Sequence, residues 1–437
     1  MNPLAVELNE KLAKNNPHVL ELLSETGKDF FFPKGILSQS AEAKSKAHKF
    51  NATIGIATED GNPMYLPCIR KHFPNFDPSQ IFPYAPPAGK PELRQLWREK
   101  MLQENPTLKG KHFSTPIVTN ALTHGLSIVG DLFIDPGDHI VAPDQIWGNY
   151  RLTFEVRNKG VFRYFPFFNE TNRLNVDAFS KTLKESAREK GKAMVLLNFP
   201  NNPTGFTPSV EEGECIVAAI REVAETGCNI LVLIDDAYFG LFYEDSLKES
   251  LFGRLANLHP RILAVKVDGA TKEDFVWGFR TGFITFADGH SEANPEVLDV
   301  LEKKTMGIIR ATISNCPHPS QTFILDALKN PDFAREKEAK FNILKNRALE
   351  VKAVLGQDKF KEVWDYYPFN SGYFMTLKLK EVDAEALRVH LLDKYGVGTI
   401  STGKRDMRIA FSCIAKEHIA ELFDIIFQGA RDLLTRD

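Results

Sequence analysis

Short apolar runs alternate with segments of helical periodicity between about residues 115 and 290 of the chain. Runs of this length suit buried strands, and apolar positions three or four residues apart suit the helices that cover them. Seven runs predict strands: Pro116–Thr119, His139–Ala142, Val161–Phe165, Ala193–Asn198, Ile230–Asp235, Ile262–Val267 and Gly282–Phe286. The alternation predicts a large α/β domain with a mostly parallel, helix-covered sheet of seven strands.

The C-terminal part of the chain has a different pattern. Helical stretches around Asp332–Val354 and Ala384–Tyr395 alternate with short strands near Gly372–Leu379 and Met407–Phe411. This mixture predicts a smaller α+β domain.

The length of 437 residues also favours two domains, because one hydrophobic core rarely serves so long a chain. The N-terminal segment is too short to fold alone. We therefore expect residues 1–62 to pack on the small domain or on a partner subunit, residues 63–330 to form the large domain, and residues 331–437 to form the small one.

Composition and charge narrow the class of protein. Hydrophobic residues make up 43% of the chain and charged residues 25%, which is typical of a globular protein. The 54 Lys and Arg residues against 57 Asp and Glu residues give a net charge of −3, which offers no basic surface for nucleic acid or an anionic membrane. Small molecules are therefore the expected partners.

Targeting and redox signals point to the cytoplasm. Apolar stretches such as Ile230–Ile234 are far shorter than a membrane-spanning helix, and Met1–Asn16 lacks the apolar core of a secretory signal. The five cysteines form no Cys-x-x-Cys pair, so neither a disulfide framework nor a thiolate metal site is expected.

Three of the predicted strands end in polar clusters, at Asn198–Gly205, Asp235–Tyr238 and Asp268–Arg280. Ligands of open α/β sheets bind at the carboxyl ends of the strands. We therefore expect these three clusters to form one site.

The first cluster contains Asn201-Asn202-Pro203-Thr204-Gly205, where prolines restrict the backbone and Asn amides offer donors and acceptors. An ordinary turn is the alternative. In the second cluster, Asp235 follows a buried strand and needs a partner, while Asp236 points to the other side of the backbone. A structural ion pair or a helix cap is the alternative for either acid.

The third cluster places Lys272 in a strand-end loop with Arg280 eight residues further on. Desolvation and a neighbouring cation lower the pKa of a lysine enough to make its amine a nucleophile, and arginine is a good partner for a phosphate. Taken alone, Lys-Glu-Asp is more typical of a solvated surface.

Together, the three clusters resemble the class I/II aminotransferases, which are fold-type I pyridoxal-phosphate enzymes. The resemblance runs from about Asn51 to Arg408 and is nearest to the aspartate and aromatic aminotransferase branch. The stretch Ile54–Gly61, followed by Leu66-Pro67, is similar to that branch's N-terminal substrate loop and implies a substrate contact at Gly55.

The resemblance implies pyridoxal 5'-phosphate as the cofactor, with Lys272 as its Schiff-base lysine. It makes Asp235 the partner of the pyridine nitrogen, and Asn202 and Tyr238 the partners of the phenolic oxygen. Asn202 would also contact the substrate, and Arg280 would bind the phosphate.

Four further residues follow from the same resemblance. Trp147 would stack on the pyridine ring, with a core tryptophan as the alternative. Arg408 would bind the substrate α-carboxylate, with a surface ion pair as the alternative. Arg310 would bind a distal carboxylate across a dimer interface, and Tyr84 would reach the phosphate of the neighbouring subunit, which implies a homodimer with shared sites.

The chain departs from the family pattern in two places. The phosphate cup contains Ala121, Leu122 and Thr123, so backbone N–H groups and the Thr123 hydroxyl would bind the phosphate. Gly269 stands where many members have a serine, which implies one missing hydroxyl contact and weaker cofactor retention.

The function implied is transfer of an amino group between an L-amino acid, aspartate-like or aromatic, and a 2-oxo acid such as 2-oxoglutarate. A pyridoxal-phosphate lyase or decarboxylase is the first alternative, because the same fold supports those reactions. A non-catalytic amino-acid-sensing domain is the second, although Met1–Asn51 shows no helix-turn-helix.

Overall fold

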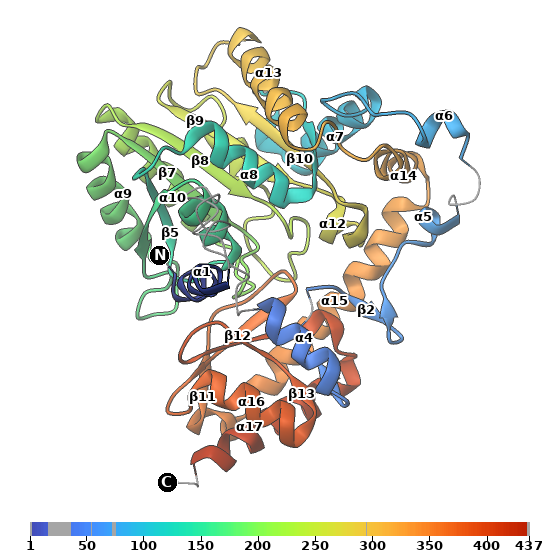
Figure 1. The fold of residues 1–437 in the computed structure, drawn as a ribbon, viewed down its shortest axis with the longest axis vertical. Helices are drawn as coiled ribbons and strands as arrows, with labels where there is room; N and C mark the ends of the chain where they lie inside the picture. The colour runs from blue at the N-terminus through green and yellow to red at the C-terminus, as the bar shows by residue number, and fades with distance from the viewer. Residues whose placement is uncertain (1, 16–35, 54, 72–75, 294, 435–437) are drawn as a thin grey trace.

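The computed structural model describes residues 2–15, 36–53, 55–71, 76–293 and 295–434. Its main element is a seven-stranded sheet in the order β4-β10-β9-β8-β7-β5-β6 (Figure 1). The strands are β4 (Ile117–Asn120), β5 (His139–Pro143), β6 (Val161–Phe165), β7 (Lys192–Asn198), β8 (Asn229–Asp235), β9 (Ile262–Asp268) and β10 (Thr281–Ala287). The predicted sheet is confirmed, because buried parallel strands are nearly continuous apolar runs.

The direction of the strands brings the polar clusters together. Strands β6, β5, β7, β8 and β9 are mutually parallel, and β10 runs antiparallel to β9 and β4. Asn198 is in register with Asp235, and Asp235 with Val267. The strands β7, β8 and β9 therefore end at one edge, and the antiparallel β10 begins there.

Helices cover both faces of this sheet. Consecutive residues of β10 point to opposite faces. Phe283 stacks on Trp97 of α7 (Pro91–Glu104) with ring centroids 4.2 Å apart, whereas a Cβ atom at Gly282 would touch Ala121 of α8 (Ala121–Phe133). Therefore α7 and α8 lie on opposite faces, while α9 (Val176–Lys190) contacts β5 and β7 and α10 (Val210–Glu225) contacts β8.

The small domain is built on a four-stranded antiparallel sheet in the order β11-β12-β15-β14. Its strands are β11 (Trp364–Tyr366), β12 (Phe374–Leu379), β14 (Ile400–Ser401) and β15 (Asp406–Ala410), and its helices are α15 (Phe333–Leu355), α16 (Ala384–Tyr395) and α17 (Ile419–Leu434). Asp383 caps the start of α16 and Gly396, at φ 64°, ends it, so the sequence predicted its bounds closely.

The N-terminal segment contacts the small domain. Strand β1 (Phe50–Asn51) pairs in parallel with β13 (Val397–Gly398), and α4 (Ile36–Lys46) packs on β13 and α16 (Figure 1). The domain boundaries after residues 62 and 330 stay predictions.

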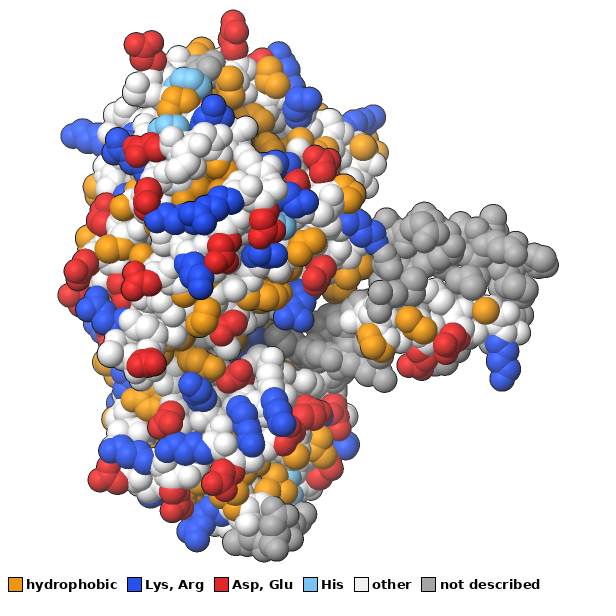
Figure 2. Space-filling view, turned by 90° about the vertical axis from the view of Figure 1, so that its left-hand side faces the viewer, with side chains coloured by type: hydrophobic (Ala, Val, Ile, Leu, Met, Phe, Trp, Pro, Cys, Tyr) orange, Lys and Arg blue, Asp and Glu red, His pale blue; other side chains and the backbone are white. Residues whose placement is uncertain are grey.

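The remaining elements connect these layers: α1 (Pro3–Asn15), β2 (Thr58–Glu59), β3 (Asn62–Pro63), α5 (Pro67–Lys71), α6 (Pro78–Ile81), α11 (Leu251–Leu255), α12 (Ala270–Glu273), α13 (Pro295–Thr312) and α14 (His318–Lys329). Within the described ranges, no helix is long and apolar enough to cross a membrane. On the face drawn in Figure 2, basic and acidic side chains are interspersed.

Candidate active site

Lys272 lies in the short helix α12, directly after β9. Its Nζ atom is 5.4 Å from the centre of the Tyr238 ring, and its carbonyl oxygen accepts a hydrogen bond of 2.8 Å from the Tyr373 hydroxyl. Burial lowers the pKa of Lys272 to about 8; the nearby Asp235 opposes this shift and Arg280 adds to it. The side chain is therefore an amine that loses its proton at mildly alkaline pH, as a nucleophilic lysine must.

The two acids at the end of β8 have different partners. Asp235 is buried, accepts a hydrogen bond of 2.6 Å from the Tyr150 hydroxyl and accepts another from the Ala237 N–H. Burial raises the pKa of Asp235, against the effect of the Tyr150 hydrogen bond. Asp236 forms a buried ion pair of 2.6 Å with Lys266. Of the two, Asp235 is the acid that lies near Lys272, and Asp236 is part of the core.

Tyr150 is a site residue that the sequence did not indicate. It is buried at the start of a π-helical segment, Arg151–Arg157, and its ring meets that of Trp147 edge to face at 5.5 Å. Trp147 therefore packs against Tyr150, whose hydroxyl is bonded to Asp235, and a flat ligand bound at Asp235 would be expected to contact its ring. The available signal was the three-residue spacing of two aromatic residues, together with a buried carboxylate that needs a donor.

Arg408 lies on β15 and is 2% exposed. Its Nη1 atom donates to Asn202 Oδ1 at 3.0 Å, and Nη2 donates to the Thr53 carbonyl at 3.1 Å. Its Nε atom is buried and has no hydrogen-bond partner among the described residues. Burial lowers the pKa of Arg408 to about 10, so the guanidinium is desolvated and still charged at neutral pH. Such a group favours a carboxylate ligand.

Phe374 of β12 connects the substrate-side residues. Its ring lies 4.2 Å below the Arg408 guanidinium, and a Cβ atom at Gly55 would lie 3.5 Å from its Cζ atom. Gly205 has a φ of +77°, and a Cβ atom there would lie 2.0 Å from the Phe374 carbonyl oxygen. Only glycine fits this turn, so the Asn202 loop packs directly on β12 and meets Arg408.

The start of α8 forms a cup of backbone N–H groups. Ala121 has a φ of +61°, Leu122 is buried and Thr123 is exposed. In the described part of the chain, Asn120 Oδ1 and Thr271 Oγ1 are buried without a hydrogen-bond partner. The N–H groups of a helix start and the Thr271 hydroxyl can donate to an anion such as a phosphate, whereas Asn120 Oδ1 can only accept. Arg280, whose Nη1 donates to the Trp277 carbonyl at 3.3 Å, lies exposed at the same edge of the sheet.

Close packing explains why position 269 is a glycine, and the sequence did not reveal this packing. A Cβ atom at Gly269 would lie 2.6 Å from the Cα atom of Gly282 and 2.7 Å from the carbonyl oxygen of Thr281. The backbones of β9 and β10 are therefore too close for any side chain at this position. The absent hydroxyl is a consequence of this contact.

The chemical types of these groups suit pyridoxal phosphate. They are an amine of lowered pKa, a buried carboxylate, an aromatic ring, an arginine and a helix start that can bind a phosphate. The sequence matches the family described as "Aminotransferase class I and II" over residues 47–426. The chain belongs to this family. Its members are pyridoxal-phosphate-dependent transferases that move an amino group between an amino acid and a 2-oxo acid, so the predicted family and enzyme class are confirmed.

Several proteins are similar to this aminotransferase. A "Probable aspartate/prephenate aminotransferase" from Aquifex aeolicus is 27% identical over 65% of this chain and 67% of its own length. The mitochondrial aspartate aminotransferase of Dictyostelium discoideum is 24% identical over 85% of this chain and 88% of its own. A crystal structure of an aminotransferase from Anaerococcus prevotii has a TM-score of 0.82 at 22% identity, covering 93% of this chain and 98% of that one. The last match supports the fold.

Two predicted residues of this aminotransferase are exposed in the single chain. Arg310 of α13 is exposed, and its Nη1 atom donates to Ser314 Oγ. Tyr84 is 90% exposed. Both were predicted to act across a dimer interface, so their roles stay predictions.

Proposed function

We propose that this aminotransferase binds pyridoxal phosphate through Lys272 and transfers the amino group of an aspartate-like or aromatic L-amino acid to a 2-oxo acid such as 2-oxoglutarate. One observation carries the proposal. Half-buried Lys272, with its pKa lowered to about 8, lies at the same sheet edge as Asp235 and Arg280. The aspartate and prephenate named for relatives support the choice of substrate.

The cofactor site follows from these positions. Asp235 would hold a proton on the ring nitrogen, Trp147 would cover the ring, and Asn202 and Tyr238 would donate to the phenolic oxygen. The Oδ1 atom of Asn202 already accepts a hydrogen bond from Arg408, so the NH₂ group of the amide would be the donor to the phenolic oxygen. Arg280 and the start of α8, formed by Ala121, Leu122 and Thr123, would hold the phosphate. Gly269 would contribute its backbone alone.

When bound, pyridoxal phosphate supplies an aldehyde for the amino group and a ring that withdraws electrons. Arg408 binds the substrate α-carboxylate through its desolvated guanidinium, and Asn202 fixes the orientation of that guanidinium. Gly55 leaves room for the substrate beside Phe374. The amine of Lys272 would take the proton from the substrate Cα and deliver it to the cofactor carbon C4′, on the far side of the nitrogen, because its lowered pKa suits both general base and general acid.

We also propose a cytoplasmic homodimer in which Tyr84 and Arg310 serve the partner's site. Exposed aromatic side chains and the state of the cysteines support this proposal. Tyr84 and Phe82 are 90% and 79% exposed, which is unusual for aromatic side chains without a partner surface. None of the five cysteines, all within the described residues, forms a disulfide, as suits a reducing compartment.

The first test is the visible absorbance of the purified protein with pyridoxal phosphate, beside Lys272→Ala. Wild type should show a cofactor band that Lys272→Ala lacks, and borohydride should fix the cofactor to the peptide containing Lys272. An amino donor should bleach the band and a 2-oxo acid should restore it. Release of ammonia or carbon dioxide without need for a 2-oxo acid would identify a lyase or decarboxylase instead.

The substrate assignment needs its own test. Turnover of aspartate, alanine and phenylalanine should be compared in wild type and Arg310→Ala. If Arg310 binds a distal carboxylate, the variant should lose aspartate turnover selectively. An unchanged preference would refute the role of Arg310 and favour neutral or aromatic substrates.

A further inference from the structure

Two acidic residues follow Lys272 directly, and both are buried. Glu273 and Asp274 are 3% and 1% exposed. Burial raises the pKa of Asp274 to about 6, even though a nearby lysine opposes the shift. Buried carboxylates are costly unless cations pair with them, so their partners matter to the whole loop.

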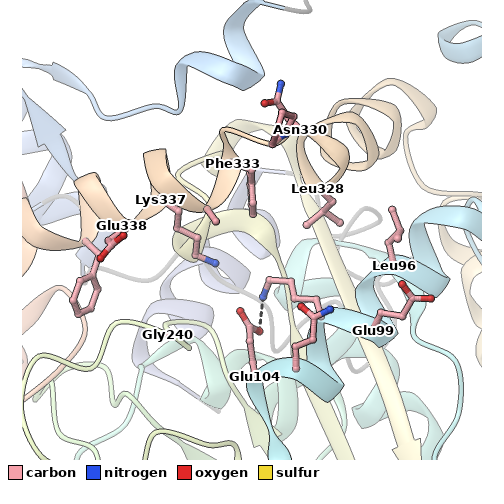
Figure 3. Close-up of a pocket in the computed structure, with 14 residues that line it drawn as sticks. Leu96, Glu99, Glu104, Gly240, Leu328, Asn330, Phe333, Lys337 and Glu338 are labelled. Carbon is pink, nitrogen blue, oxygen red and sulfur yellow. Dashed lines mark hydrogen bonds and ion pairs between the residues drawn. The ribbon is translucent and has the colours of Figure 1, made fainter.

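Their partners come from two helices that are distant in the sequence. Lys100 of α7 lies 3.1 Å from Glu273 and 2.7 Å from Glu104. Lys337, near the start of α15, lies 3.4 Å from Glu273 and 2.9 Å from Asp274. Figure 3 shows Lys337 extending from α15 toward Glu104, across the wall of an open cleft of about 660 Å³.

Helix α15 also touches the substrate-binding side of the molecule. Lys340 pairs with Glu59 of β2, and Arg347 donates to the carbonyl of Ser412, which closely follows Arg408. One continuous helix therefore contacts the loop of Lys272 near its start and the segment after Arg408 further along.

We propose that Lys337 is a positioning residue for Lys272: by binding Glu273 and Asp274 it fixes the Lys272 loop to α15, and through α15 to the segment that carries Arg408. This inference rests on the role proposed for Lys272. Lys337 itself does not touch substrate or cofactor.

The positive charge of Lys337 offsets the cost of burying Glu273 and Asp274. Without Lys337, Asp274 keeps no cation within ion-pair distance among the described residues, and Glu273 keeps only Lys100. The loop then gains free energy by moving its carboxylates toward the cleft and water. That movement exposes Lys272, and the lost positive charge acts in the same direction, so the pKa of Lys272 rises.

The other titratable groups near Lys272 are not substituted in such a variant, and of these only the loop carboxylates Glu273 and Asp274 are expected to move. The rest are Asp235 and Tyr238 after the end of the β8 apolar run, Tyr373, Arg280 on the same loop and Lys100 on α7. A shift in the pKa of Lys272 would therefore report on Lys337.

The test uses the full-length chain, freed of cofactor, and follows acetylation of Lys272 by acetic anhydride against pH with mass spectrometry. Wild type should show a midpoint near 8. In Lys337→Gln the midpoint should rise by about one pH unit, and Lys337→Arg, which keeps the charge, should restore it. The control is Lys303→Gln, which breaks an exposed pair with Asp299 on α13 and should leave the midpoint unchanged.

In the holoenzyme, Lys337→Gln should lower kcat about tenfold with little change in KM, because ground-state contacts to the substrate remain. A lower melting temperature with an unchanged Lys272 midpoint and unchanged kcat would show a merely structural role and overturn the proposal.

Hydrogen exchange of wild type gives a second measurement that needs no variant. The amides of Asp274 and Val276 donate to Ala270 and Thr271 within the loop. They should open with the same free energy as the start of α15, and much weaker protection of the loop would overturn the coupling. Acetylation and hydrogen exchange need no bound cofactor, so a wild type that fails to bind pyridoxal phosphate would refute the proposed function and leave this inference to those two results.

Discussion

At the scale of single residues, two residues of the proposed cofactor site, Ala121 and Tyr150, have unusual local geometry. Ala121 holds a left-handed backbone angle at the start of α8 that normally belongs to glycine. Tyr150 places a hydroxyl on a buried carboxylate. The Ala121 backbone costs free energy, whereas the Tyr150 hydroxyl offsets part of the cost of burying Asp235.

Ala121→Gly should stabilise the protein by about 1 kcal/mol, because the strain of a Cβ atom at a φ of +61° disappears. Urea unfolding measures the change, with Ala339→Gly as the control. Ala339 is exposed in the interior of α15, so glycine there should destabilise by about 1 kcal/mol. Loss of stability in Ala121→Gly would contradict the assigned strain.

Tyr150→Phe should weaken pyridoxal phosphate binding by about tenfold, equivalent to the loss of one buried hydrogen bond to a carboxylate. Without the hydroxyl the pKa of Asp235 rises further, so Asp235 holds the proton of the ring nitrogen less well. Fluorescence titration with the cofactor measures this affinity. Tyr164→Phe, which removes a partly exposed hydroxyl bonded to Arg151, should bind as wild type does.

At the scale of elements, the contact between β9 and β10 decides what the Lys272 loop can contain. Gly269 and Gly282 face each other across this contact, and Gly282 also lies against the start of α8. The backbones of the Gly269 segment, of β10 and of the start of α8 therefore meet at the proposed phosphate site.

Gly269→Ser should destabilise the protein by about 2 kcal/mol and should not tighten cofactor binding, although serine is common there in the family. The added Cβ atom would meet backbone atoms of Thr281 and Gly282, which cannot rotate away. Thermal unfolding and cofactor titration measure both effects. Gly307→Ser, on an open face of α13, serves as the control with near-normal stability. Tighter binding in Gly269→Ser would show that the loop accepts a hydroxyl.

The elements were more predictable than the contacts between them. Strands such as β8 could be predicted from the sequence, because burial on both faces makes them continuous apolar runs. The functions of Lys272 and Asp235 were inferred from strand ends and a family resemblance. Tyr150, Phe374 and the packing reason for Gly269 were not found, because each depends on a contact between segments far apart in the chain. Periodicity within one segment carries no information on such contacts.

At the scale of the whole molecule, exposed aromatic residues suggest that one chain is an incomplete enzyme. Tyr84 and Phe82 lie in the segment before α7 and are largely exposed. The predicted homodimer would give them a function.

Mixing inactive Tyr84→Ala with inactive Lys272→Ala should restore roughly a quarter of the wild-type sites, because hybrid dimers then contain one intact site. Activity and bound cofactor after unfolding and refolding the mixture measure the recovery. Each variant refolded alone is the control. If Tyr84 serves its own chain, or if the protein is a monomer, the mixture should show no gain over its components.

The antiparallel direction of β10 has a further consequence for how the site can change. Because the chain leaves the sheet after Asp268 and re-enters it at the same edge at Thr281, residues 269–280 form one loop that bears both Lys272 and Arg280. Asp235 ends β8, Arg408 lies on β15 and Asn202 lies in the loop after β7, so these three residues can vary one at a time. An insertion in this loop would displace the nucleophile and the phosphate partner together, so the loop should be the least adaptable part of the site in directed evolution.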